Sequence, residues 1–204
     1  MDAVTGIFSA FGLSASAGLN AYIPLLVVAL VARYTDYIKL TEPWDTLTNG
    51  WIIALLIVLV LIEFFADKVP AINHINDAVQ TFVRPTAGAI VFAANAKVIT
   101  EIHPVLALSA GLLLAGSIHA VKSLAVRPAV TATTGGVGNV PVSILEDFIS
   151  TLLSILAIVI PIIIGTTVLL LVSYIFWRLY RRQKVKDLKI GSESLTNVNS
   201  TEGT

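Results

Sequence analysis

The hydrophobic positions of this chain lie in long blocks, separated by short polar stretches. The first block covers residues 4–31 and has no charged residue before Arg33. It is longer than the roughly 20 residues with which a helix crosses a ~30 Å hydrocarbon core. Residues 12–20 in its middle are small or polar, and Pro24 follows. This pattern predicts a break or a close helix contact within the first block.

Four further apolar blocks are candidate membrane segments. Residues 51–66 follow a polar loop, whereas residues 85–96 form a block that is marginal as a full span. Residues 104–118 come next, and residues 148–177 are long enough to cross with tilt and a kink at Pro161. The blocks predict an all-α, polytopic α-helical membrane protein with about five transmembrane segments (four to six), some of them broken or re-entrant.

The C-terminal end of the chain is basic and polar. Trp177, Arg178, Arg181 and Arg182 form an aromatic and basic stop, which the positive-inside rule places in the cytoplasm. We expect an integral membrane domain over residues 1–183 and a basic cytoplasmic tail over residues 184–204, disordered from about Lys189. The N-terminus lies outside if there are five spans, or inside if the first block folds back on itself.

Composition narrows the function classes. Hydrophobic residues make up 56% and charged residues 13% of the chain, which is unlike a soluble protein. There is no cysteine, so disulfides, thiolate metal sites and cysteine nucleophiles are excluded. Lys and Arg balance Asp and Glu at 13 each, and the basic excess belongs to the tail, so we expect no nucleic-acid partner. No hydrolase motif is present, and we expect no enzyme.

Two segments of the chain resemble each other. Residues 78–85 read almost like residues 120–128 with one residue inserted, and each copy follows an apolar block and ends in Arg-Pro. Paired units are typical of transporter folds, in which broken helices meet near the midplane. Chance similarity in a chain rich in Ala and Val is an equally good explanation.

One acid, Glu63, lies within the second block, and a second acid, Asp67, directly follows the block. Glu63 and Asp67 are four residues apart, so they share one face near a helix C-terminus, where the helix dipole also disfavours them. An ionised carboxylate at helix-centre depth costs ~2.5–3.5 kcal/mol on insertion scales. Such acids form either a site for a proton or a hard metal ion, or internal ion pairs. The candidate partners for such pairs are Lys68, Arg84, Lys122 and Arg127.

Residues 67–84 have the pattern of an amphipathic helix. Its apolar residues recur at helical spacing, and the polar stripe opposite consists of Asn73, Asn76, Asp77, Gln80 and Arg84, with His74 on the same polar segment. This stripe either lies in the membrane interface or lines a wet cavity. Histidine titrates near neutral pH, so His74 and His119, which lie on the two polar segments, are candidates for a proton relay.

Each Arg-Pro pair predicts a helix start. Proline fits the first turn of a helix, where free N–H groups attract anions, so Arg84 and Arg127 together predict an anion pocket. The alternative is that these two arginines only neutralise nearby acids.

The stretch of residues 131–139 is rich in Gly and Thr. Gly135, Gly136, Gly138 and Asn139 are flexible enough to offer backbone groups to an ion or to gate a site. The Lys-Ser/Thr pair of a P-loop is missing, so we expect no nucleotide.

The residues after this loop match a helix-capping pattern. Ser143 and Glu146 fit a capping box, and Asp147 fits a first-turn acid, which explains all three without a functional role. The other interpretation places them in the polar site.

Several motifs in order resemble a known family. The residues that carry the resemblance are Gly-Leu-Asn-Ala-Tyr-Ile-Pro-Leu at 18–25, Glu-Phe-Phe-Ala-Asp-Lys-Val-Pro at 63–70, Arg84-Pro85, Thr-Gly-Gly-Val-Gly-Asn at 134–139 and residues 143–147. They resemble a bacterial membrane-protein family known only as a domain of unknown function, over roughly residues 6–175. The resemblance implies only a polytopic membrane protein of prokaryotic type and supplies no activity. We expect it to lie in the cytoplasmic (inner) membrane. The acidic motif is also faintly similar to the Glu-x-Gly-Asp-Lys-Thr motif of cation/proton exchangers, although its acids are one residue further apart.

Together these features predict a small membrane transporter or channel that moves an ion or small solute, with proton coupling, through a buried polar site. The alternatives are translocation of a lipid or polyprenyl phosphate, or a non-transporting scaffold or assembly factor. We expect membrane lipids and a homodimer or larger homo-oligomer as partners, and no cofactor beyond a bound hard cation or anion. The predicted site consists of Glu63, Asp67, Lys68, Asn73, His74, Asn76, Asp77, Arg84, His119, Lys122 and Arg127.

Overall fold

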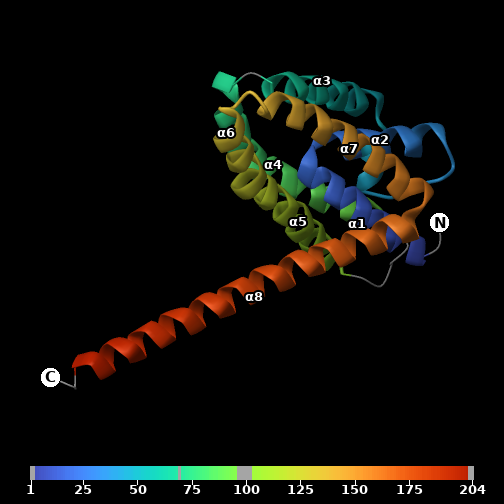
Figure 1. Ribbon diagram of the computed structural model, residues 1–204. Coiled ribbons are helices and arrows are strands. Elements are labelled where there is room, and N and C mark those ends of the chain that lie inside the picture. Colours follow the sequence, from blue (N-terminus) through green and yellow to red (C-terminus); the bar gives the residue numbers. More distant parts are fainter. Residues whose placement is uncertain (1–2, 69, 96–102, 202–204) are drawn as a thin grey trace. The chain divides into compact units, whose positions relative to one another are not determined.

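The computed structural model describes residues 3–68, 70–95 and 103–201, and these residues form helices joined by short connections (Figure 1). The side chains of residues 3, 70–75, 77, 179 and 183–201 lie outside this description. The predicted all-α fold class is confirmed for the described part of the chain. The chain divides into two units, Met1–Thr166 and Thr167–Thr204, and each is considered by itself.

The first apolar block is split into two helices. α1 covers Ala3–Leu19 and α2 covers Tyr22–Tyr34, so the predicted break lies at Asn20. The Asn20 side-chain oxygen accepts hydrogen bonds from the N–H groups of Tyr22 and Ile23, 3.1 Å away in each case. These N–H groups open α2 and have no partner inside it, so Asn20 stabilises the new helix start.

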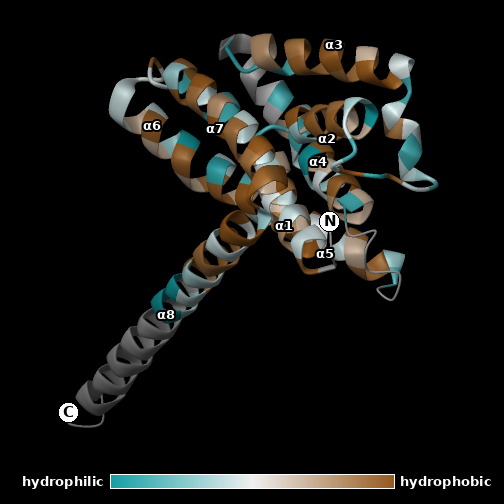
Figure 2. Cartoon of the chain, turned by 90° about the vertical axis from the view of Figure 1, so that its right-hand side faces the viewer, coloured by the Kyte–Doolittle hydropathy of each residue, from teal (hydrophilic) through white to brown (hydrophobic). Residues whose placement is uncertain are grey.

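The second apolar block is the helix α3, Gly50–Ala66, which follows the short 3-10 helix η1, Trp44–Thr48. Asn49 caps α3 by accepting a hydrogen bond from Trp51 N at 2.9 Å. Most of the α3 surface is apolar and exposed, as Figure 2 shows in brown, while Ile53, Leu56 and Glu63 are buried. An exposed apolar face of this kind fits lipid surroundings better than water.

One helix replaces two predicted segments in the middle of the chain. α4 covers Pro70–Asn95 with Pro85 inside, so the expectation of a helix start at Arg84-Pro85 was wrong. An internal proline removes the backbone hydrogen bond to the carbonyl group four residues earlier, and that residue, Thr81, is exposed. The predicted amphipathic stripe and the short apolar block are therefore parts of the same helix.

The next helix contains a change of winding. α5 covers Pro104–Val121, and the π-helical turn η3, Lys122–Val126, joins it to α6, Arg127–Thr134. A π-turn accommodates one extra residue in a helix and is frequent at functional sites. It coincides with the one-residue insertion that distinguishes residues 120–128 from residues 78–85.

The last apolar block is divided at Pro161. α7 covers Asn139–Val159 and α8 covers Pro161–Thr201, with Ile160 between them at φ −130° and ψ 60°. A proline disfavours helical geometry in the residue before it, so the chain breaks where we predicted only a kink. α7 also begins well before residue 148, and α8 runs as far as Thr201. The predicted disorder of the tail stays a prediction.

Three helices in the described part of the chain are long and apolar enough to cross a membrane. They are Pro104–Thr134, Asn139–Val159 and Pro161–Arg182. α1, α2 and α3 are apolar but shorter. These lengths fit a membrane protein, and the number of spans stays a prediction.

Small residues allow the helices of the first unit to approach closely. Ser14 Oγ lies 3.1 Å from the Gly88 carbonyl oxygen and 2.9 Å from that of Gly111, so it joins α1 to α4 and α5. A Cβ atom built on Gly111 would overlap the Gly88 carbonyl oxygen and lie 2.6 Å from Phe92 Cβ. Close contact at small residues is a common way for membrane helices to associate.

Replacing Gly111 with Ala should therefore force α4 and α5 apart. We expect a loss of ~1–3 kcal/mol in unfolding free energy, typical of overpacking, seen as a lower midpoint of thermal unfolding in detergent. Gly116→Ala on the same helix is the matched control, because its Cβ would meet Pro85 Cγ at an ordinary 3.6 Å. Equal midpoints for the two variants would contradict this packing.

Candidate functional site

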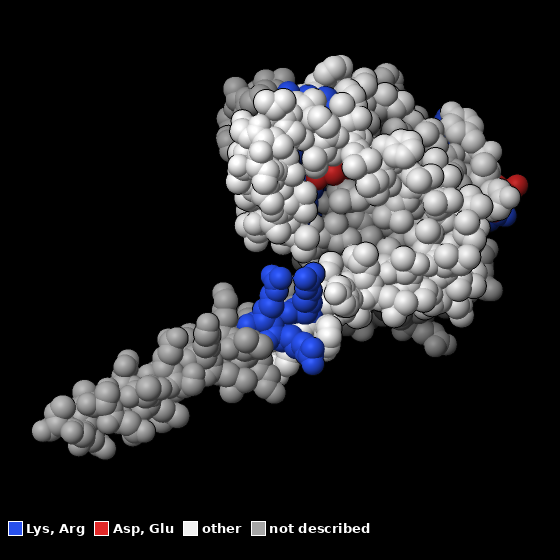
Figure 3. Space-filling model, viewed as in Figure 1, with Lys and Arg blue, Asp and Glu red and all other residues white. Residues whose placement is uncertain are grey.

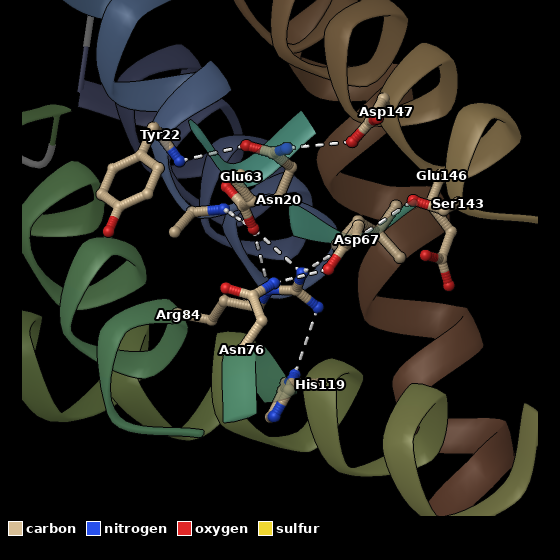
Figure 4. A network of polar contacts seen from close by, with 12 residues as sticks. Asn20, Tyr22, Glu63, Asp67, Asn76, Arg84, His119, Ser143, Glu146 and Asp147 are labelled. Carbon is tan, nitrogen blue, oxygen red and sulfur yellow. Dashed lines mark hydrogen bonds and ion pairs between the residues drawn. The ribbon is translucent and has the colours of Figure 1, made fainter. Parts of the chain in front are cut away.

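Charged side chains from five helical elements meet inside the first unit (Figure 4). Eight of these side chains form ion pairs within the group, six in one network and Lys68 with Asp147 as a separate pair. We call this group the charge cluster: Glu63, Asp67, Lys68, Arg84, Lys122, Arg127, Glu146 and Asp147. They come from α3 and the residues after it, from α4, from η3, from α6 and from α7. The described cluster contains four cations and four carboxylates, so these charges balance.

The innermost pair of the cluster is Glu63 with Arg84. Both side chains are fully buried, and Glu63 Oε1 lies 2.9 Å from Arg84 Nη2 and 3.3 Å from Arg84 Nε. Ala21 N, at the α1–α2 break, approaches the same oxygen at 3.5 Å. The other oxygen, Oε2, is buried and has no hydrogen-bond partner among the described residues. A buried polar atom without a partner is costly, so Oε2 is a favourable place for a proton.

Asp67 is surrounded by donors. Its Oδ1 accepts a hydrogen bond from Asn76 Nδ2 at 2.6 Å, and its Oδ2 accepts from Arg127 Nη2 at 3.0 Å and Ser143 Oγ at 3.3 Å. Arg84 Nη2 and Lys122 Nζ lie 3.6 and 3.9 Å from Oδ2. Asn76, Arg127 and Ser143 thus donate hydrogen bonds to Asp67, whereas Arg84 and Lys122 lie within ion-pair distance of it.

The remaining pairs tie the cluster to the α1–α2 break. Lys122 Nζ lies 2.7 Å from Glu146 Oε2 and donates to the carbonyl oxygen of Leu19, the last residue of α1, at 3.1 Å. Asp147 pairs with Lys68 at 3.1 Å and accepts a hydrogen bond from Asn20 Nδ2 at 2.9 Å. The break is thus held from both sides by charged groups.

His119, on α5, extends the network from Arg84 to Thr81, and both of these residues lie on α4. Its Nδ1 lies 3.3 Å from Arg84 Nη1, and its Nε2 lies 3.2 Å from the hydroxyl of the exposed Thr81. A guanidinium can only donate, so Nδ1 accepts and the ring proton is on Nε2, which donates to Thr81. This geometry assigns His119 as neutral and connects the buried pair with a surface hydroxyl.

Exposure increases from the innermost pair toward one end of the cluster. The side chains of Glu63 and Arg84 are 0% exposed and those of Asp67 and Lys122 only 2–3%, but Glu146 and Lys68 reach 11% and 15%. Figure 3 shows acidic atoms in a recess of a largely uncharged face. The cluster is therefore buried without being sealed completely from the surface.

Most of the predicted site residues come together in this network. The structure joins Glu63, Asp67, Lys68, Asn76, Arg84, His119, Lys122 and Arg127. The side chains of Asn73, His74 and Asp77 lie outside the described residues. Arg84 pairs with Glu63 and Arg127 pairs with Asp67, which corresponds to the alternative in which these arginines neutralise nearby acids.

Two local interpretations were wrong. Ser143 lies inside α7, since that helix begins at Asn139, so it caps nothing and donates to Asp67 instead. The two Arg-Pro pairs form no pair of free helix ends either. Arg84 is within α4, and Arg127 N donates to the Lys122 carbonyl oxygen of the preceding π-turn.

The glycine-rich stretch forms the turn between α6 and α7. Gly135 and Gly136 have φ values of 64° and 92°, which favour glycine, and both face open space. Gly138 N donates to Thr134 Oγ1, and Asn139 Nδ2 donates to Thr131 Oγ1. These two hydrogen bonds close the turn, whereas Asn139 Oδ1 is buried and has no hydrogen-bond partner among the described residues. A gating role of the turn stays a prediction.

Sequence reasoning missed some polar contacts of the network. We interpreted Asn20 only as a helix breaker, yet it caps α2 and also binds Asp147. Ser16 on α1 forms hydrogen bonds with Ser150 and Ser154 on α7, at 2.8 and 2.7 Å between hydroxyls. Spacings of four residues between small polar residues were the available signal for this contact.

The acids of the cluster face cations. In the described part of the chain, no three His, Asp or Glu side chains lie close enough together to hold a metal ion. The carboxylates of the cluster are groups that can bind and release protons, and its cations can exchange one carboxylate partner for another.

Comparison with known proteins identifies the family. A domain of unknown function, DUF4126, matches residues 7–181, so the chain belongs to this family. No curated protein and no solved structure matches the chain. The expectation of an uncharacterised family is therefore confirmed, and the function has to be argued from the charge cluster.

Replacing Arg84 with Gln should leave Glu63 buried without its counter-charge. Removing one partner of a buried pair costs ~3–5 kcal/mol, so we expect a large fall in the thermal unfolding midpoint and in the yield of folded protein. The double variant Glu63→Gln/Arg84→Gln removes both charges and should regain much of that loss. A double variant as unstable as Arg84→Gln alone would contradict the pairing.

Proposed function

We propose that this member of the DUF4126 family is a small transporter in the cytoplasmic membrane that moves an ion or small solute through the charge cluster. A carboxylate of the cluster exchanges a proton during each cycle, and the C-terminus lies in the cytoplasm. The exposed apolar faces of the helices and the basic end of the apolar part of α8 support this placement. We expect a homodimer or larger ring, because few helices surround the cluster.

The observation that carries the proposal is the free oxygen of Glu63. Glu63 Oε1 holds the ion pair with Arg84, whereas the buried Oε2 has no hydrogen-bond partner among the described residues. A proton can therefore bind Oε2 while the contact of Oε1 with Arg84 persists. An acid used only as a clasp gains more stability when both oxygens are satisfied.

The backbone around the cluster supports the same interpretation. The cluster contacts the α1–α2 break through Ala21 N and the Leu19 carbonyl oxygen, and it includes Lys122 of the π-turn. Broken helices at buried polar sites are typical of transporters, and π-turns are frequent at functional sites in general. Both features give the backbone a place to change conformation when the charges re-pair.

The cations of the cluster share their acids, which allows re-pairing. Arg84 contacts Glu63 and Asp67, and Lys122 and Arg127 each contact Asp67 and Glu146. One contact of each cation is short and the other lies between 3.6 and 3.9 Å. A small displacement can exchange one partner for the other, so no charge is left unpaired during such a step.

Two polar routes lead from Glu63 toward the surface. One passes from Arg84 through His119 to the exposed Thr81, and the other passes through Asp67 and Arg127 to Glu146. A transport site needs access from two directions, and these routes are the candidates. Lipid translocation is less favoured, because a head group would have to reach arginines that are 0% and 9% exposed.

The competing proposal is a non-transporting scaffold with the charge cluster as a helix clasp. The observation that favours it is that each of the four cluster cations contacts at least one acid. The same pairs serve both proposals, so function has to be separated from stability by experiment.

Replacing Glu63 with Gln should stop ion-driven flux in proteoliposomes without unfolding the protein. Arg84 keeps Asp67 as a counter-charge at 3.6 Å and its contact with His119, so we expect a smaller fall in the unfolding midpoint than for Arg84→Gln and enough folded protein for the assay. The flux should fall about 100-fold or more, as for loss of an acid–base group. Glu42→Gln, in an exposed loop, is the control and should transport normally. Wild-type flux in Glu63→Gln, or failure of that variant to accumulate, would favour the clasp.

Removing the residues after Lys189 should leave flux unchanged, because none of them belongs to the charge cluster. The truncated and full-length chains are compared in the same liposome assay at equal protein density. A scaffold that acts through its tail predicts a different result, namely loss of its cellular function while the protein still folds.

A further inference from the structure

The end of the apolar part of α8 carries three arginines on one side of the helix. Arg178 lies three residues before Arg181 and four before Arg182, and this spacing brings side chains to the same helix face. All three residues are exposed, and Figure 3 shows Lys and Arg atoms gathered on one short stretch of α8. We call Arg178, Arg181, Arg182 and the neighbouring Trp177 the α8 basic face.

The arginines of the α8 basic face have a charge that the chain does not balance locally. No described Asp or Glu forms an ion pair with any of them. Residues 161–192 contain six Lys and Arg against one acid, Asp187, which leaves an excess of five positive charges. Like charges at helical spacing repel one another, so an anion that binds between them stabilises this end of the helix.

One of the three guanidinium groups is held in place by an aromatic ring. Arg181 Cζ lies 4.7 Å from the centroid of the Trp177 ring, whose centroid lies 6.1 Å from that of Tyr174. A guanidinium over a ring still directs N–H donors outward in its own plane, where they match two oxygens of a phosphate. Arg181 is therefore pre-organised to bind an oxyanion.

The position of the α8 basic face along the helix matches the depth of lipid head groups. Pro161–Arg182 is apolar and long enough to cross a membrane. Its uncharged part, residues 161–177, is ~25 Å long at 1.5 Å per residue, close to the ~30 Å of a hydrocarbon core. Trp and Tyr prefer the boundary between this core and the head groups. The arginines thus lie at the level of the bilayer phosphates.

We propose that the α8 basic face binds one anionic phospholipid of the adjoining leaflet, with the phosphodiester held by the arginines and the glycerol end of the lipid against Trp177. The positive excess selects an anionic lipid, because it repels the amine of a zwitterionic head group. A soluble phosphorylated molecule fits less well, since it would leave the half-exposed rings of Tyr174 and Trp177 without an apolar partner. The site lies on α8 alone and does not depend on the charge cluster, so it goes beyond the proposed transport function.

Native mass spectrometry of the full-length protein in a non-ionic detergent measures binding to this face. Phosphatidylglycerol and phosphatidylcholine with identical acyl chains compete for the protein, and the mass of each complex identifies the lipid that is bound. The first phosphatidylglycerol should bind about tenfold more tightly than the first phosphatidylcholine.

The triple variant Arg178→Lys/Arg181→Lys/Arg182→Lys separates a phosphate site from general charge attraction. Lysine keeps the charge and the positive-inside signal but lacks the planar fork, so the affinity for phosphatidylglycerol should fall about tenfold. Arg33→Lys is the matched control. Arg33 is exposed and lies over the Tyr34 ring, but α2 has no second arginine, so this variant should bind like the wild type.

Each other outcome overturns part of the proposal. Equal affinities of the wild type for the two lipids would refute the anionic preference. A triple variant that binds phosphatidylglycerol like the wild type would refute the phosphate site and leave only diffuse attraction. Displacement of the lipid by inorganic phosphate at constant ionic strength would identify a site for a soluble oxyanion and refute the lipid.

The single variant Arg181→Lys keeps the test decisive if the triple variant does not accumulate. It removes only the fork that lies over Trp177, so we expect about a threefold loss of affinity for phosphatidylglycerol. An unchanged affinity in this variant would refute the site.

Discussion

A charge inside an apolar helical protein is tolerated only with a counter-charge, and the pair of Glu63 with Arg84 is where this constraint acts most strongly. Both side chains are fully buried. Arg84, on α4, also contacts Asp67 and His119. Its guanidinium group therefore connects α4 with α3, with the residue after α3 and with α5. The positions of these elements follow from the need to keep its donors occupied.

The same pairing explains why the backbone is irregular at this depth. α1 ends at Leu19, whose carbonyl oxygen accepts from Lys122, and α2 begins with N–H groups that Asn20 satisfies. Interrupted helices expose polar backbone groups, which are tolerated in an apolar protein when side chains satisfy them. The charge cluster and the helix break therefore stabilise each other through direct contacts.

Sequence could predict the parts of this arrangement that depend on local patterns. The break near Asn20, the helix over Gly50–Ala66 and the set of cations available to Glu63 all follow from the order of residues. The other features depend on packing between helices that are distant in the sequence. Pro85 was expected to begin a helix and lies inside one, and the capping pattern at Ser143 was misleading because Pro141 already occupies the first turn of α7. Which cation meets which acid depends on contacts between distant helices, which no local pattern encodes.

The central claim is that the charge cluster exchanges protons with both sides of a membrane. The most direct measurement records the internal pH of liposomes that contain the wild-type protein after a gradient of a small anion is imposed. The account predicts a change of internal pH that is faster than in protein-free liposomes and that saturates with anion concentration. Equal rates in the two preparations, with correctly folded protein in the bilayer, would contradict transport and leave the cluster as a clasp between helices.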